Sequence, residues 1–224
     1  MKTLAILSAI ITISLSQAQA QQNNSWEFGI QAEYGNDWYH RAYYEWESLP
    51  NGYIQDFPSY HSRGVGIFAE RILNSQFSLL GQLNYTQKKM PVDMFGERSA
   101  TGARWVTKEV HHRGSADIGL RWYVNPKSQL RFFVDGKLAA NILIAAVQRV
   151  EGFGNVATWN AFGYDRIAPT VSGSAGIKWK RLAISVEYRH DLAPVKRNIS
   201  RTGITSQALE GKVAFTLFRS GTAD

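Results

Sequence analysis

The chain has 224 residues, no cysteine and a formal net charge of +7 at pH 7. This length suits one domain and is too short for two ordinary domains joined by a linker. The lack of cysteine excludes disulfides, thiol catalysis, cysteine metal sites and an acylated cysteine anchor.

The first twenty residues differ from the rest and predict a cleavable signal peptide over residues 1–20. Lys2 supplies a positive start, an apolar stretch runs from Leu4 to Leu15, and Ala18-Gln19-Ala20 offers a cleavage site with small residues. The alternative, a transmembrane helix, needs about 20 apolar residues, more than this stretch provides. The mature domain is then 21–224, and an exported basic chain favours lipopolysaccharide or other anionic lipid over nucleic acid as its partner.

Residues 26–34 show the clearest pattern of the mature chain, because the even positions are apolar and the odd ones are polar or glycine. Side chains of a strand alternate between two faces, so this pattern predicts one apolar and one polar face. Seven further segments alternate in the same way: 64–70, 77–86, 115–122, 130–141, 171–179, 182–189 and 209–217. The total of eight strands is even, as closed bacterial barrels require.

The connections between these segments alternate between long and short. The long ones run over 36–62, 87–113, 145–168 and 190–206, and the short ones over 73–75, 124–129 and 180–181. Outer-membrane barrels have short turns in the periplasm and long loops outside. The sequence therefore predicts an all-β fold: an eight-stranded antiparallel up-and-down transmembrane β-barrel with short periplasmic turns and long extracellular loops.

Alternation alone does not say which face is buried, and a soluble lipocalin-type barrel would point its apolar face inward. Two features favour lipid on the apolar side. Charged residues are absent from its centre, where a lysine or arginine would cost about 2–4 kcal/mol. Its aromatic residues also gather near the strand ends, as two interfacial girdles do: Trp26, Phe77, Trp122, Phe132 and Trp179 beside the short turns, and Tyr34, Tyr85 and Tyr188 at the loop end.

The polar face carries seven acids and six bases that would fill the lumen. They are Glu27, Glu33, Glu70, Asp117, Arg121, Arg131, Asp135, Lys137, Lys178, Glu187, Arg189, Glu210 and Lys212. Unpaired charges in so narrow an interior are costly, so we expect a structural network of ion pairs and a plugged lumen. A proton or ion path is the alternative interpretation of the same residues.

The sequence predicts no catalytic residue, no metal site and no cofactor. The one arrangement that resembles a hydrolase set is His190-Asp191 with Ser200 or Ser206 nearby, and its spacing is not specific. His111 and His112 are adjacent in a strand and would point to opposite faces, so they would not share one ion.

The long connections are rich in aromatic and basic residues. The first holds Trp38, Tyr39, Tyr43, Tyr44 and Trp46; the second holds Lys88, Lys89, Arg98, Arg104, Lys108 and Arg113; the fourth holds Lys196, Arg197 and Arg201. Exposed aromatics beside cations suit contact with an extracellular protein or glycan, or with lipopolysaccharide. Alternatively they pack on one another and close the top of the barrel.

Three features carry a resemblance to a known family. They are the signal, the eight alternating strands and the segment Val186–Leu192, which looks like a penultimate strand entering the last outer loop. The chain resembles the outer-membrane-protein β-barrel domain family, including small OmpA/OmpX-like and PorT-like barrels. This resemblance implies the outer membrane of a Gram-negative bacterium, contact with the barrel-assembly machinery during biogenesis, and no single activity.

The leading hypothesis is a non-enzymatic barrel with a structural, adhesive or surface-interaction role in its loops. The alternatives are an enzyme that modifies outer-membrane lipid, and a narrow channel or transport accessory.

Overall fold

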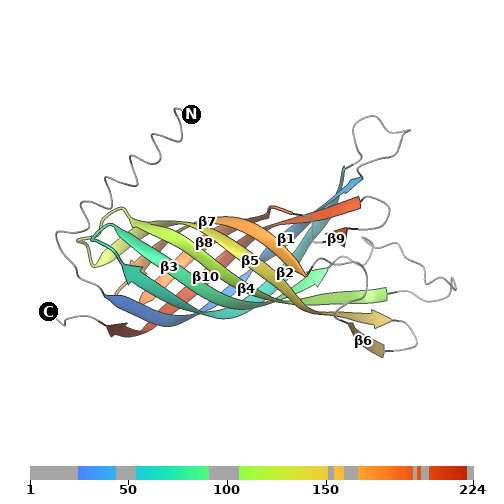
Figure 1. Ribbon diagram of the computed structural model, residues 1–224, viewed down its shortest axis with the longest axis horizontal. Coiled ribbons are helices and arrows are strands. Elements are labelled where there is room, and N and C mark those ends of the chain that lie inside the picture. The colour runs from blue at the N-terminus through green and yellow to red at the C-terminus, as the bar shows by residue number, and fades with distance from the viewer. Residues whose placement is uncertain are drawn as a thin grey trace.

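The computed structural model describes residues 25–43, 54–90, 106–150, 154–158, 166–193, 196–197 and 202–220, and the predicted signal peptide over 1–20 lies outside them. Every regular element of this part is a strand (Figure 1): β1 (Trp26–Tyr43), β2 (Ile54–Ile72), β3 (Phe77–Met90), β4 (Val106–Tyr123), β5 (Leu130–Val150), β6 (Gly154–Thr158), β7 (Ile167–Trp179), β8 (Leu182–Asp191), β9 (Lys196–Arg197) and β10 (Thr202–Ser220). Within the described residues, no helix is long and apolar enough to cross a membrane.

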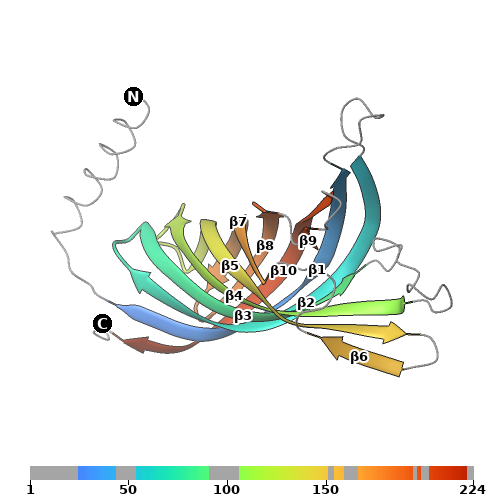
Figure 2. The ribbon, with the colours of Figure 1, turned by 45° about the vertical axis from the view of Figure 1, so that its right-hand side comes forward.

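Eight of these strands form a closed sheet. The order is β1-β2-β3-β4-β5-β7-β8-β10, and β10 pairs antiparallel with β1 from Trp26↔Ser220 to Tyr43↔Thr202. The short β6 pairs with the end of β5, and β9 pairs with the start of β10. Figure 2 shows β6 beyond the region where the eight strands close. The predicted eight-stranded antiparallel barrel is confirmed.

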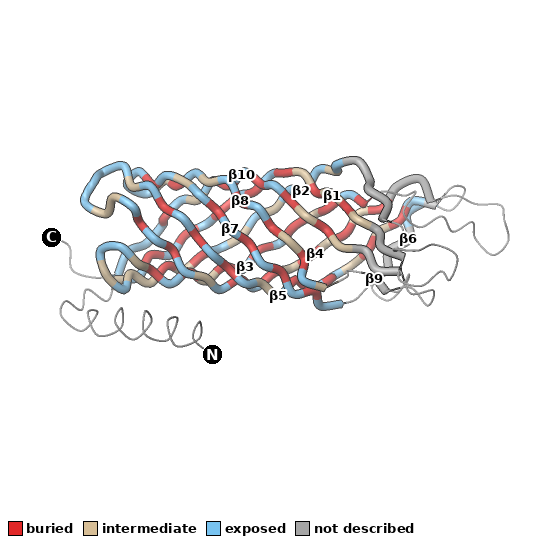
Figure 3. The backbone as a smooth tube through the Cα atoms, turned by 90° about the horizontal axis from the view of Figure 1, so that it is seen from above, coloured by how far each residue is buried: buried red, intermediate tan, exposed pale blue. Residues whose placement is uncertain are grey.

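The two faces of the sheet separate by polarity, as Figure 3 shows in the alternation of buried and exposed residues along each strand. In β3 the inward residues from Ser78 to Met90 are buried, while Leu79, Leu83 and Tyr85 are exposed. In β7 the inward Ser172, Ser174 and Lys178 are buried. Most of the interior is polar and most of the exterior is apolar, which is the reverse of a soluble protein and fits a lipid-facing wall.

Glycines on the inner face make room for the aromatic side chains of neighbouring strands. A Cβ on Gly29 would lie 2.5 Å from the ring of Phe68, and one on Gly176 would lie 2.6 Å from the ring of Phe133. Phe68 and Phe133 are buried. Each glycine is the ladder partner of the aromatic residue, Gly29↔Phe68 and Gly176↔Phe133. The aromatic ring therefore occupies the inner volume that a side chain on the glycine would need.

Short turns join the strands at one end of the barrel, called the inner end here. In the β2–β3 turn, the Asn74 side-chain oxygen accepts hydrogen bonds from the backbone N–H groups of Gln76 and Phe77, both at 2.8 Å. The β7–β8 turn is Lys180-Arg181, and Lys180 has a φ of 53°. The first and last strands also meet at this end, since Trp26 pairs with Ser220. The opposite end is called the outer end.

Strands continue well into the predicted long connections, so those boundaries were wrong. β1 runs on to Tyr43 and β2 begins at Ile54, although the connection was predicted over 36–62. β4 likewise begins at Val106 and β5 ends at Val150. In these extensions the hydrophobic contrast between the faces fades, while the backbone ladder continues through pairs such as His40↔Thr205. Sequence alternation follows the apolar belt, whereas strand length follows hydrogen bonding.

Candidate functional site in the barrel lumen

The inner half of the lumen holds a cluster of polar side chains around Glu70 of β2, which is fully buried. Its carboxylate accepts hydrogen bonds from Ser78 Oγ and Tyr123 Oη, both at 2.6 Å. It also forms ion pairs with Arg121 at 3.1 Å and Lys178 at 2.9 Å. Four donors from three other strands therefore surround one carboxylate, which compensates its removal from water.

The cations of this cluster extend it across the barrel. Lys178 Nζ donates to Glu27 Oε2 at 2.6 Å, so β7 is joined to β1 across the lumen. The guanidinium of Arg121 donates to both oxygens of Asp135, at 2.8 and 2.9 Å. Two parallel bonds fix the plane of the guanidinium as well as its distance. Arg219 at the rim adds an ion pair to Glu27 at 3.1 Å.

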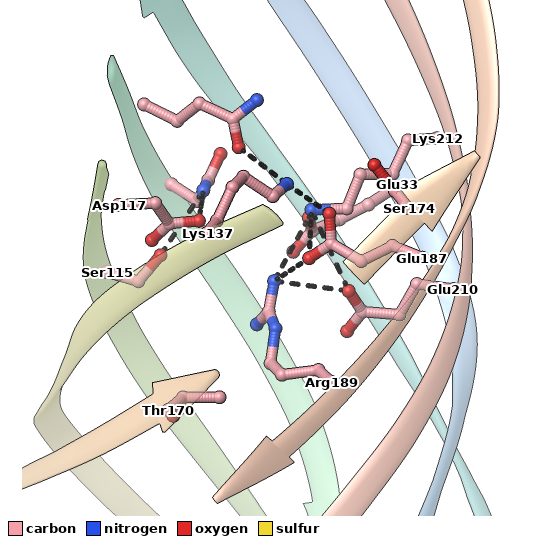
Figure 4. A network of polar contacts seen from close by, with 12 residues as sticks. Glu33, Ser115, Asp117, Lys137, Thr170, Ser174, Glu187, Arg189, Glu210 and Lys212 are labelled. Carbon is pink, nitrogen blue, oxygen red and sulfur yellow. Dashed lines mark hydrogen bonds and ion pairs between the residues drawn. The ribbon is translucent and has the colours of Figure 1, made fainter. Parts of the chain in front are cut away.

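A second cluster fills the middle of the lumen and is centred on Glu187 of β8 (Figure 4). Glu187 accepts from Lys137 of β5, and it pairs with Lys212 at 3.1 Å and Arg189 at 3.2 Å. Lys212 also pairs with Glu33 of β1 at 3.0 Å. Side chains of four strands therefore meet in one region, as Figure 4 shows from close by.

Two further acids lie in this middle region. Glu210 pairs with Arg189 at 3.2 Å and with Lys212 at 3.9 Å. Asp117 accepts a hydrogen bond from Asn84 Nδ2 at 3.2 Å.

The thirteen residues that the sequence assigned to the lumen all lie on the inner face. Arg131 is half-buried, and its guanidinium lies 4.5 Å from the centre of the Tyr123 ring. The other twelve are buried: Glu27, Glu33, Glu70, Asp117, Arg121, Asp135, Lys137, Lys178, Glu187, Arg189, Glu210 and Lys212.

A third group of charged residues, near the outer end, was not assigned to the lumen from the sequence. Lys88 Nζ lies 2.5 Å from Asp37 Oδ1, and His111 Nε2 lies 2.5 Å from Glu109 Oε1. Gln148 donates to the second oxygen of Glu109 at 2.7 Å. A signal was present, since Asp37 has the same parity as the inward Glu27 and Glu33 of its strand.

Ser200 of the hydrolase alternative lies outside the described residues, and the described members of that set do not come together as a catalytic set. Asp191 is buried in the lumen, where it accepts hydrogen bonds from Ser206 Oγ at 2.5 Å and Thr170 Oγ1 at 3.1 Å. His190 is adjacent in β8 and belongs to the opposite face. A base that faces away from both the acid and the serine cannot activate that serine.

The other pair of histidines also divides between the faces. His111 is buried inside beside Glu109, whereas His112 lies outside with its Nδ1 at 2.5 Å from Tyr85 Oη. Among the described residues, no group of three or more His, Asp or Glu could hold a metal ion.

The aromatic residues assigned to the girdles lie on the outer face. At the inner end, Phe77 is half-buried and the others are exposed, and cations rest on two of them: Arg71 at 5.7 Å from the centre of Trp26, and Lys180 at 5.1 Å from that of Trp179. The remaining exposed members are Trp122, Phe132, Tyr34, Tyr85 and Tyr188.

A closed antiparallel barrel with an apolar outer wall and a charged interior defines the class of this protein: it is an outer-membrane β-barrel of Gram-negative type. Its structure is similar to that of the outer membrane protein OprG from Pseudomonas aeruginosa, with a TM-score of 0.51, 6% identity, and coverage of 91% of this chain and 99% of OprG. Neisserial surface protein A matches with a TM-score of 0.44, 13% identity, and coverage of 85% of this chain and 97% of that protein. Ail, the attachment invasion locus protein of Yersinia pestis, was solved with the heparin analogue sucrose octasulfate and matches with a TM-score of 0.39, 13% identity, and coverage of 85% of this chain and 99% of Ail. No family model and no curated protein sequence matches the chain. The similarity to OprG supports the barrel fold, and at these identities none of the comparisons carries a function to this chain.

Proposed function

We propose that this protein is a closed, non-enzymatic outer-membrane barrel that serves as a scaffold for surface interactions at its outer end. The observation that carries the proposal is the set of ion pairs that crosses the lumen. Glu70–Lys178 joins β2 to β7 and Glu27–Lys178 joins β1 to β7, while Lys137–Glu187 joins β5 to β8 around the intervening β7. An eight-stranded barrel is just wide enough for side chains to fill, so these pairs occupy the space that an open pore would need.

Energetics support a lumen that stays closed. The side chains of Glu70 and Glu187 are 0% exposed, so separating either from its cations would leave a buried charge without compensation. Breaking one buried pair costs about 3–5 kcal/mol. Opening a continuous water path would require changes at both clusters, which argues against the channel alternative.

Planar-bilayer recording tests the closed lumen. We expect no stepwise current from the wild-type protein, and we expect currents to appear when one cation of each cluster is replaced, in the variant Lys178→Ala/Lys212→Ala. The double variant must first show the heat-dependent gel mobility of a folded barrel. Unitary steps in the wild-type recording would favour the channel alternative and would contradict the proposal.

The outer end supports the interaction role. β1 extends nine residues beyond Tyr34, to Tyr43. At about 3.3 Å per residue and a tilt near 40°, this raises the strand by roughly 20 Å above the outer aromatic level. Adhesion to an extracellular protein or glycan would then use the connections that this stem carries.

Lipopolysaccharide is the membrane partner that we propose for the outer end. On the outer face of β2 and β3, Arg63 and Lys89 are exposed. Arg63 Nε and Nη2 donate to Gln87 Oε1 at 2.9 and 2.7 Å, which holds the guanidinium in place. A fixed guanidinium beside a lysine suits the phosphate groups of a glycolipid.

A glycan array with the protein in lipid nanodiscs tests the interaction role. The matched control replaces residues 44–53 and 91–105 by glycine-serine linkers of equal length and leaves the described barrel unchanged. We expect wild-type binding that the control loses. Binding that survives the replacement would show that these connections do not carry the role.

A further inference from the structure

The charges of the barrel divide between inside and outside by sign. All ten carboxylate side chains that the structure describes are buried: Glu27, Glu33, Asp37, Glu70, Glu109, Asp117, Asp135, Glu187, Asp191 and Glu210. The exposed charged side chains of the described residues are all basic: Arg63, Lys89, Lys127, Arg149, Arg166, Lys180, Arg181 and Arg219. The exterior of this part of the barrel therefore has an excess of positive charge, with exposed acids absent from it.

Several of these cations form a continuous arc at the inner end. Lys180 and Arg181 make the β7–β8 turn, and Arg219 Nη2 donates to the Lys180 carbonyl oxygen at 2.9 Å. The arc continues over the next strands, because Trp26 pairs with Ser220 on one side and with Arg71 on the other. We call this group the inner-rim arc; its members are Trp26, Arg71, Trp179, Lys180, Arg181 and Arg219.

Two cations of the inner-rim arc lie against lipid-facing rings. Lys180 Nζ lies 5.1 Å from the centre of Trp179, and the Arg71 guanidinium lies 5.7 Å from that of Trp26. Tryptophan at the end of a transmembrane strand marks the level of the lipid headgroups. The cations are thus at headgroup depth, with their stems along the apolar wall.

The nearest acid does not neutralise the whole arc. Glu27 is 2% exposed and pairs with Arg219, while Lys178 and Thr216 also bind it from inside the lumen. Lys180 and Arg181 are exposed, and the ion pairs of the described residues do not include them. Two cations of the arc therefore remain available for an external anion.

We propose that the inner-rim arc binds the phosphate headgroups of anionic phospholipids in the periplasmic leaflet. The partner is identified by position and charge: the inner end has the short periplasmic turns, and guanidinium and ammonium groups at headgroup depth suit a phosphodiester. The remaining turns of the inner end are much less basic, since the β2–β3 turn over 73–76 has no charged residue and the β4–β5 turn contributes Lys127. Binding is therefore confined to one sector of the rim. This inference does not depend on the closed lumen or on the outer loops.

Native mass spectrometry of the full protein tests this proposal. The barrel is folded in bilayers of equal parts phosphatidylcholine and phosphatidylglycerol with identical acyl chains, and the lipids that it retains in mild detergent are counted. We expect the wild type to retain phosphatidylglycerol in preference. In the Lys180→Gln/Arg181→Gln variant, the ratio of retained phosphatidylglycerol to retained phosphatidylcholine should fall about five-fold for each cation removed. The matched control, Arg149→Gln/Arg166→Gln, removes the same charge at the outer end and should keep the wild-type preference.

Each variant is first checked for heat-dependent gel mobility, so that a folding defect is not read as lost binding. Equal retention of the two lipids by the wild type would overturn the proposal. An equal loss of preference in both variants would also overturn it, because it would trace the preference to overall charge instead of the inner-rim arc.

Discussion

Replacing Lys178 by methionine tests the lumen network at a point where two carboxylates share one cation. Lys178 Nζ lies 2.6 Å from Glu27 and 2.9 Å from Glu70, and its side chain is 2% exposed. Methionine keeps most of the side-chain volume and removes the charge. The two carboxylates would then face the same uncharged site.

The expected loss of stability follows from the donors that remain. Removing one partner of a buried pair costs about 3–5 kcal/mol because the other charge stays buried. Glu27 would keep Arg219 and Thr216, and Glu70 would keep Arg121 at 3.1 Å. These partial compensations place the expected loss at the lower end, about 3 kcal/mol. The double variant Lys178→Met/Glu27→Gln removes one of the stranded charges, so it should recover about 1–2 kcal/mol of that loss.

Urea unfolding in phospholipid vesicles measures these changes, followed by tryptophan fluorescence and by the heat-dependent gel shift. The control is Lys127→Met, which removes an exposed charge from a periplasmic turn and should change stability by no more than about 0.5 kcal/mol. If Lys178→Met lost no more stability than this control, the ion pairs would not stabilise the barrel and the reasoning would be refuted.

Three further changes have defined outcomes. Leu120 is 50% exposed on the lipid face, so Leu120→Lys should lower the unfolding free energy in vesicles by about 2–4 kcal/mol, whereas Leu120→Ile should leave it nearly unchanged. A Cβ on Gly176 would lie 2.6 Å from Phe133, and one on Gly136 would meet nothing within 4 Å; Gly176→Val should therefore cost about 1–3 kcal/mol, and a similar loss for Gly136→Val would contradict this explanation. His190 faces away from Asp191 and Ser206, so His190→Ala should leave the lipid A species of the host membrane unchanged by mass spectrometry, and an altered acylation pattern would revive the enzyme alternative.

The parity of the strands allowed the inner face to be predicted wherever one face is apolar. Beyond Tyr34 each face of β1 mixes polar and aromatic residues, so alternation gave little contrast and Asp37 was assigned to a loop. In β5 a register irregularity lies opposite His112 and Arg113, after which the buried residues change from Leu143 to Ala146 and Gln148. An extra residue in one strand reverses which parity faces inward, and the sequence carries no local mark of it.

The partners across the lumen could not be predicted at all. Glu70 and Lys178 are 108 residues apart, on strands that are not neighbours in the sheet. Which inward residues share a height depends on the stagger accumulated over all eight strands. Strand parity predicts which side chains lie inside the barrel. Which of them form pairs is determined by the geometry of the closed sheet.

The division of charge by sign follows from the shapes of the side chains and connects the lumen to the membrane. Lysine and arginine have long apolar stems that can lie along the barrel wall while the charge reaches the interface. Aspartate and glutamate are shorter, and the anionic lipid surface would repel them there, so their favourable place is among donors in the lumen. Burying acids such as Glu70 and Glu187 beside internal cations therefore stabilises the interior. The same distribution leaves Lys180 and Arg181 at the rim with no exposed acid of the described barrel to neutralise them, so the pattern that closes the lumen also makes the outer wall attractive to phosphate.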